Sequence, residues 1–219
     1  MAKMMMLIDP SRCTGCRGCQ VACKQWNGLP ATATTFTGSY QNPPDLNGDT
    51  YTLVRFQEYA LDGFRVSWLM TNDKCRHCSE PTCTDMMQAD MYYRSPEGAV
   101  VFNEKAKMAA DEVASACPFN IPTQNKKTGL VVKCTLCVDR IADGLEPACA
   151  KTCPTDAIMW GDYDGMMKYA QDRIEWLKKT QKDRFDPAKV KLYPEASFAC
   201  HVRWILLDTR ERHGLNGDM

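Results

Sequence analysis

Cysteine spacing is the feature of this sequence that can carry chemistry. Thirteen of the 219 residues are cysteine, an odd number gathered in tight local groups, which favours metal or cluster ligation over disulfides. The first group has the spacing C-x2-C-x2-C-x3-C. The last group repeats that module with its second gap lengthened, and it ends in C-x3-C-P. Their members are Cys13, Cys16, Cys19 and Cys23, and Cys134, Cys137, Cys149 and Cys153.

The C-x2-C-x2-C spacing fits a 4Fe-4S cluster, because a tight loop can bring three thiolates to three iron corners of one face. The cysteine four positions after the third lies about one helical turn further on, so it points away toward a neighbouring cluster. In two-cluster bacterial ferredoxins this fourth cysteine ligates the other cluster. The same exchange predicts cluster one from Cys13, Cys16, Cys19 and Cys153, and cluster two from Cys134, Cys137, Cys149 and Cys23.

A middle group of cysteines predicts a third cluster. Cys75, Cys78 and Cys83 lack a local fourth cysteine, whereas Cys117, followed by proline, stands without a triplet. The exchange rule pairs these two fragments. A fourth cluster would need cysteines at four positions that hold Met87, Lys107, Ala110 and Val113. The expected cofactors are therefore three 4Fe-4S clusters, and Cys200 is left over as a buried, inert thiol.

Zinc is the main alternative metal, because tetrahedral zinc sites also use paired C-x2-C spacing. It suits the looser middle group better than the contiguous first quartet. His77 could suggest a Rieske centre, but such a site needs two histidines on one iron. Basic residues near the cysteines are either simply solvated or offset the negative charge of the clusters. Lys151 and Arg76 are the best placed for that second role.

Composition excludes several classes of protein. Twenty-seven Lys and Arg residues balance 27 Asp and Glu residues, with no basic run, so a nucleic-acid binder is not expected. No apolar run approaches the roughly 18 residues of a membrane span. The apolar stretch that precedes Pro10 is too short for a secretory signal. The sequence also has no nucleotide fingerprint and no nucleophile with a paired base.

Electron transfer remains as the expected chemistry. A cluster closed by four thiolates leaves no iron open to a substrate, so this chain is expected to have no catalytic residues of its own. The classes left open are an electron-transfer subunit of a larger oxidoreductase, a free-standing ferredoxin-like carrier, and a radical enzyme with one bare iron. The long chain outside the cluster-binding segments favours the subunit, because it supplies surface for a large partner.

The rest of the chain predicts an α+β fold of tandem ferredoxin-like modules with short strands, long loops and a C-terminal helix. Helices are expected at 104–116 and 166–180, and a long surface loop from 28 to 47. The expected domains are 1–27 with 130–162 (clusters one and two), 28–129 (cluster three) and 163–219, which docks on a partner. Strand-like runs occur at Met4–Ile8, Tyr51–Phe56, Arg65–Met70, Ala99–Phe102, Ala157–Trp160 and Val202–Leu207.

Several segments carry a family resemblance. They resemble the small beta (iron-sulfur) subunit of soluble tungsten- or molybdenum-containing formate dehydrogenases. The cysteine pattern is similar to that of four-cluster beta subunits in the wider molybdopterin oxidoreductase superfamily, and the missing fourth cluster resembles the formate dehydrogenase branch. The segments that carry the resemblance are Cys13–Trp26, Gln41–Asp45, Cys75–Cys78, Ser115–Pro118, Gly144–Cys149 and Thr152–Thr155.

The resemblance implies a heterodimer. Its large catalytic subunit would hold molybdenum or tungsten on two pterins and interconvert formate and carbon dioxide, while this chain passes electrons to a cytochrome c or ferredoxin-type acceptor. It also implies a periplasmic location by co-export with a signal-bearing large subunit, or otherwise a cytoplasmic one. A beta subunit of a thiosulfate, polysulfide or nitrate enzyme, or a free-standing polyferredoxin, is the alternative.

Overall fold

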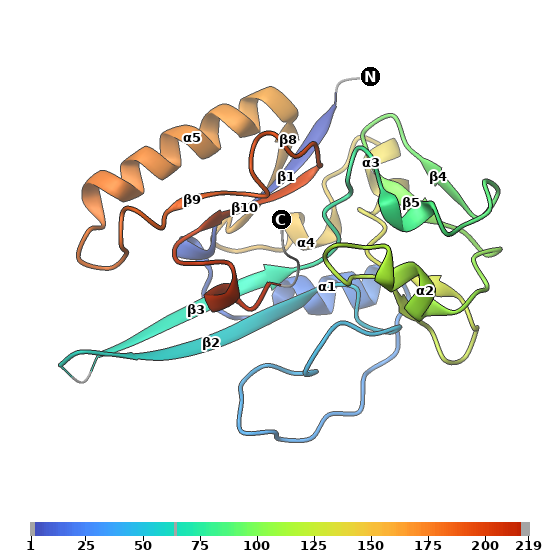
Figure 1. The fold of residues 1–219 in the computed structure, drawn as a ribbon, viewed down its shortest axis with the longest axis horizontal. Coiled ribbons are helices and arrows are strands. Elements are labelled where there is room, and N and C mark those ends of the chain that lie inside the picture. The colour runs from blue at the N-terminus through green and yellow to red at the C-terminus, as the bar shows by residue number, and fades with distance from the viewer. Residues whose placement is uncertain (1–2, 64, 216–219) are drawn as a thin grey trace.

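A four-stranded sheet with the order β8-β1-β10-β9 lies at the centre of the computed structural model (Figure 1). In the middle, β1 (Met4–Ile8) pairs antiparallel with β8 (Ile158–Asp162) and parallel with β10 (Val202–Leu206). The edge strand β9 (Lys191–Tyr193) pairs antiparallel with β10. The structure describes residues 3–63 and 65–215, so the predictions for residues 1–2 and 216–219 lie outside it. The sheet joins strands from both ends of the chain.

Both faces of this sheet are covered, which explains why β1 and β10 are almost wholly apolar. Alternate side chains of a strand point to opposite faces. Met6 and Ile8 belong to the main core, which also contains cysteines of all the predicted clusters. Met5 and Leu7 pack on the other side, where α5 (Tyr163–Thr180) covers the sheet. The C-terminal helix is thus confirmed, beginning three residues earlier than predicted because Asp162 caps the N–H of Gly165.

The longest strands form a hairpin, β2 (Leu53–Leu61) with β3 (Arg65–Asp73), in nine antiparallel pairs. The predicted strands are shorter than these. Side chains in the outer half of the hairpin are mostly exposed, so the sequence gives only a weak strand signal there. In Figure 1 the hairpin projects away from the sheet, and its turn lies at the outer end. Its buried end, where β3 finishes, reaches the centre of the molecule.

The middle of the chain forms a set of short elements around their own small core. Two-stranded ladders join β4 (Tyr92–Arg94) to β5 (Val100–Phe102) and β6 (Thr123–Gln124) to β7 (Val131–Val132). The helix predicted over 104–116 is wrong in its first half, since α2 covers only Ala110–Ser115. Residues before α2 bond instead to the segment at 130–131, where Val131 donates to the carbonyl of Ala106 at 2.8 Å.

Three short helices lie at the cysteine groups: α1 (Gly18–Trp26), α3 (Val138–Ala142) and α4 (Ala148–Lys151). The helical turn expected after Cys19 is part of α1, whereas α3 was not predicted. Each lies within or directly after a cysteine group, and α1 packs against α4. The segment 28–46 forms neither helix nor strand and runs as an open loop beside α1 (Figure 1). The structure confirms the predicted α+β class with short strands. None of the described helices is long and apolar enough to cross a bilayer.

Three cysteine-lined cavities

The first cavity is lined by the four cysteines of predicted cluster one. The loop after the 3-10 helix η1 (Pro10–Arg12) supplies Cys13 and Cys16, and Cys19 lies in the first turn of α1. Cys153 comes from the other end of the sequence and follows α4. Cys16 is the exposed member of this set. The cavity therefore lies close to the molecular surface.

The second cavity is lined by Cys23, Cys134, Cys137 and Cys149. On α1, Cys19 and Cys23 are four residues apart but line different cavities. Cys149 on α4 and Cys153 just after it repeat this division in the opposite direction. The structure thus brings together both predicted sets of four, and the two cavities share α1 and α4 as common walls.

The third cavity is lined by Cys75, Cys78, Cys83 and Cys117. Cys83 lies in the 3-10 helix η2 (Thr82–Thr84), and Cys117 follows α2. The hydroxyl of Thr82 donates to the carbonyl of Ala116 at 2.7 Å, which ties the two segments together. The predicted pairing of a middle triplet with a distant Cys-Pro therefore matches the cavity that the structure forms.

The three C-x2-C loops have the same local geometry. In each, the residue two positions after the first cysteine has a positive φ: +68° at Gly15, +47° at His77 and +57° at Leu136. This turn directs the backbone N–H of that residue at the sulfur of the first cysteine, over 3.4–3.5 Å. Such N–H groups stabilise negative charge on a sulfur ligand. The loops are thus shaped to hold metal-bound thiolates.

Burial makes a free thiolate costly in these cavities. It raises the pKa of Cys19 to about 12, against the opposing effect of the Lys74 ammonium. Burial, together with neighbouring cysteines, raises the pKa of Cys23 well above its usual range, and it raises that of Cys137 to about 11. Sulfurs in such surroundings carry negative charge only when a metal or another cation compensates it.

The four sulfurs of each set surround a cavity, which fits a cluster of several irons. Among residues 3–63 and 65–215, no three His, Cys, Asp or Glu side chains are placed to hold a single metal ion. A tetrahedral zinc site would gather its ligands around one point. Cys200 is fully buried, and its Sγ lies 3.4 Å from the carbonyl oxygen of Val202. It belongs to none of the three cysteine sets.

Two buried lysines near the cavities were not singled out by the sequence. Lys74 is fully buried, and its Nζ lies 3.0 Å from the Sγ of Cys149. Lys133 is 5% exposed and lines the third cavity. The signal that could have found them is a repeat, because each precedes a C-x2-C pair as Lys-Cys-x2-Cys.

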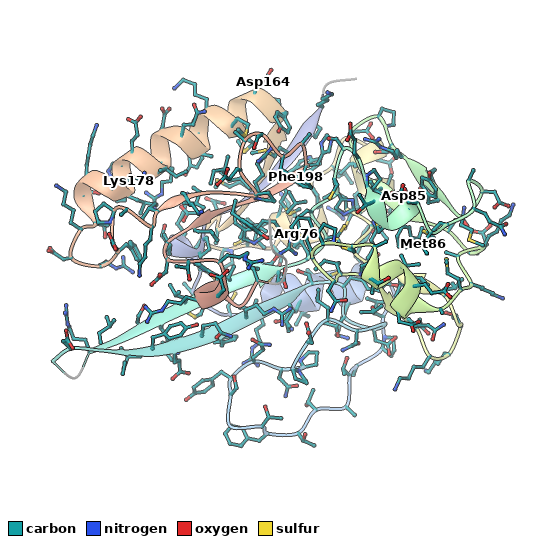
Figure 2. All side chains as sticks on the ribbon, in the orientation of Figure 1. Arg76, Asp85, Met86, Asp164, Lys178 and Phe198 are labelled. Carbon is teal, nitrogen blue, oxygen red and sulfur yellow. The ribbon has the colours of Figure 1, made fainter. Side chains whose placement is uncertain are left out.

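The two basic residues preferred from the sequence behave differently. Lys151 is exposed. Arg76 lies at the centre of the molecule (Figure 2), fully buried. Its guanidinium pairs with Asp73 at 2.7 Å and stacks over the rings of Phe119 and Trp204, each at 4.7 Å. The neighbouring carboxylate offsets its charge, so Arg76 acts mainly in packing.

The end of β3 reaches all three cavities within four residues. The side-chain amide of Asn72 donates to the Sγ of Cys19 at 3.2 Å, in the first cavity. Lys74 contacts Cys149 in the second cavity, and Cys75 lines the third. This segment therefore connects the three sets of cysteines directly.

Comparison with known proteins places these features in context. Residues 66–163 match the 4Fe-4S dicluster domain family, and residues 4–25 match the 4Fe-4S binding domain family. The chain is 44% identical over 193 residues to the formate dehydrogenase subunit beta of Megalodesulfovibrio gigas, covering 84% of this chain and 89% of that protein. It is 45% identical to the formate dehydrogenase 2 subunit beta (cytochrome c-553) of Nitratidesulfovibrio vulgaris, with 94% of each chain covered. The nitrate-inducible formate dehydrogenase iron-sulfur subunit of Escherichia coli is 39% identical, with 94% of this chain and 68% of that protein covered.

Proposed function

This chain belongs to the family of formate dehydrogenase beta, or iron-sulfur, subunits, and from that membership we propose that it carries three 4Fe-4S clusters in series. Electron transfer through 4Fe-4S domains is the role of such a subunit. The observation that supports three clusters is the presence of three cavities, each lined by four cysteine sulfurs.

The proposed ligands are the sets that line the cavities. Bound to four thiolates, a 4Fe-4S cluster accepts and releases one electron at a time and offers no open iron to a substrate. The chain supplies burial and backbone N–H donors around each proposed cluster, and buried lysines beside clusters two and three. The proposed sets are Cys13, Cys16, Cys19 and Cys153 for cluster one, Cys23, Cys134, Cys137 and Cys149 for cluster two, and Cys75, Cys78, Cys83 and Cys117 for cluster three.

The proposed partner is a large subunit that binds molybdenum or tungsten on two pterins and interconverts formate and carbon dioxide. Electrons would leave through this chain to a cytochrome c or a ferredoxin-type carrier. The name of the Nitratidesulfovibrio vulgaris relative includes cytochrome c-553, which supports the first acceptor class. We place the complex in the periplasm, exported with a signal-bearing large subunit. Fractionation of cells that express both subunits tests this location.

Metal analysis of the purified complex tests the cluster count. Three clusters in this chain require about twelve irons and about twelve acid-labile sulfides, beyond those bound by the partner subunit. A count near eight for this chain would remove cluster three, and stoichiometric zinc would show that one cavity holds a zinc ion. Native mass measurement tests the subunit role, because a free-standing carrier would shuttle electrons fully without a copurifying large chain.

A further inference from the structure

Two buried lysines occupy equivalent places in two of the cysteine groups. Lys74 directly precedes Cys75, and Lys133 directly precedes Cys134. Successive side chains of an extended segment point to opposite sides. In both segments the cysteine therefore faces one cavity while the lysine faces another.

Lys74 serves the second cavity although it precedes a cysteine of the third. It lines the second cavity, and its ammonium lies 3.0 Å from the Sγ of Cys149. Its other close contact is the Sδ of Met6 at 3.5 Å. The side chain is fully buried, so water does not screen its charge. Among the cavity sulfurs, that of Cys149 is the one it contacts by a hydrogen bond.

Lys133 has the reverse arrangement. It precedes Cys134, which lines the second cavity, but Lys133 itself lines the third. Its ammonium donates to the carbonyl of Val100 and lies 4.6 Å from the ring centre of Phe102. These contacts fix the side chain on the side of the third cavity. Its own neighbour in sequence, Cys134, faces the other way.

We propose that Lys74 and Lys133 are two buried charges that act crosswise. Each raises the reduction potential of the cluster in the cavity that it lines, and not that of the cluster bound by the cysteine next to it in sequence. This inference rests on the proposed three-cluster function. An added electron increases the negative charge of a cluster, and a fixed positive charge in a medium of low dielectric constant favours that state. Lys74 thus acts on cluster two, and Lys133 on cluster three.

Cluster one receives a different kind of support. Asn72 offers a neutral amide to Cys19, neither lysine lines the first cavity, and the cation that does, Arg17, is only half-buried. We therefore expect the charge of Lys74 to act on cluster one more weakly than on cluster two. Arg76 adds little, because it shares Asp73 with Arg55, which also pairs with Asp45, so the two positive charges are balanced by two carboxylates.

Redox titration of the intact complex, followed by electron paramagnetic resonance, tests the proposal. The variants Lys74→Gln and Lys133→Gln keep a hydrogen-bond donor but remove the charge. Lys74→Gln should lower the midpoint potential of cluster two most, that of cluster one less, and leave cluster three unchanged. Lys133→Gln should lower only that of cluster three. Lys151→Gln is the matched control: it too lies between cluster ligands in sequence, but it is exposed and should shift no potential.

Lys74→Arg and Lys133→Arg should restore the native potentials, which a purely structural role would not predict. If a Gln variant loses iron, the location of the loss gives the same test: Lys74→Gln should empty cavity two and Lys133→Gln cavity three. The proposal is overturned if each variant affects the cluster next to it in sequence, or if fully loaded variants show no shift. Fewer than three one-electron steps in the native protein would instead reject the proposed function.

Discussion

The first two cavities share their walls, whereas the third is built from segments of its own. Helix α1 carries Cys19 for the first cavity and Cys23 for the second. Likewise, Cys149 on α4 lines the second cavity, and Cys153, just after α4, lines the first. The third cavity draws on η2 and the end of α2, which pack around a small separate core that contains Cys83, Val113 and Val131. The first pair is therefore a single structural unit, and the third is an attachment to it.

The difference implies two kinds of response to damage. A change in α1 displaces cysteines of two cavities at once, because the helix is short and both Cys19 and Cys23 lie on it. A change in α2 reaches only Cys117, since the other ligands of the third cavity come from residues 75–83. The two regions meet at the end of β3, where Cys75 joins the main core.

The largest expected effect comes from proline in these two helices. Ala22 in α1 and Ala114 in α2 are both half-buried interior positions, so they form a matched pair. Proline in a helix interior costs about 3 kcal/mol and distorts the turn. Ala22→Pro should lose clusters one and two, which is about eight irons, whereas Ala114→Pro should lose only cluster three, which is about four irons. Iron analysis and electron paramagnetic resonance measure this, and equal losses would contradict the comparison.

A smaller effect is expected for Cys117→Ser. Serine keeps the shape of the side chain but is a poorer ligand for iron than a thiolate. Cluster three should be lost or altered, at a cost of at most about four irons, while the signals of clusters one and two persist. The corresponding change in the shared unit, Cys23→Ser, should also weaken cluster one through α1. Loss of all three clusters in Cys117→Ser would show that the ligand pairing is wrong.

The smallest expected effect is a loss of stability in acid, and it comes from His213, which lies against the hairpin. Burial lowers the pKa of His213 to about 4, from 6.5. Its Nε2 accepts the backbone N–H of Leu207 at 2.9 Å, which leaves Nδ1 to donate to the hydroxyl of Thr71 at 2.6 Å. The native state thus resists protonation while the unfolded state accepts it below pH 6.5. Stability should therefore fall as pH drops from about 6.5 toward 4, by about 2 kcal/mol at pH 5.

Thermal unfolding at pH 7 and pH 5 measures this prediction. His213→Gln keeps one acceptor and one donor but does not titrate, so its stability should change less between the two pH values. Because Thr71 adjoins Asn72, the native protein should show the acid effect first in the environment of cluster one. Equal pH dependence of the two proteins would exclude His213 as the cause.

The cysteine sets could be predicted from spacing, because the exchange of Cys23 and Cys153 depends on local helical geometry. The structure brings each predicted set of four together, and their role as iron ligands stays a prediction. The cysteine spacing implied a helical turn at α1 and α4, but the extent of these helices and the existence of α3 could not be read from the sequence, since no apolar repeat marks them.

Other features depend on contacts distant in sequence. The edge strand β9 exists because Leu192 pairs with Ile205 of β10, and its own three residues carry no strand signal. The role of Lys74 follows from the position of Cys149, 75 residues away. Lys151 has the more suggestive place in sequence, between ligands of two clusters, but it faces solvent. Sequence neighbours of a ligand are thus a poor guide to the charges that surround its cluster.

The short segment from Asn72 to Cys75 links groups in all three cavities through one continuous stretch of backbone. Three residue steps of extended chain span at most about 11 Å, so the backbone positions of Asn72, Lys74 and Cys75, whose side chains reach the three cavities, cannot move further apart than that. Loops elsewhere can lengthen or change without altering this interval. A single residue inserted between Asn72 and Lys74 would turn the two side chains to opposite sides, so that their contacts with Cys19 and Cys149 could no longer form together.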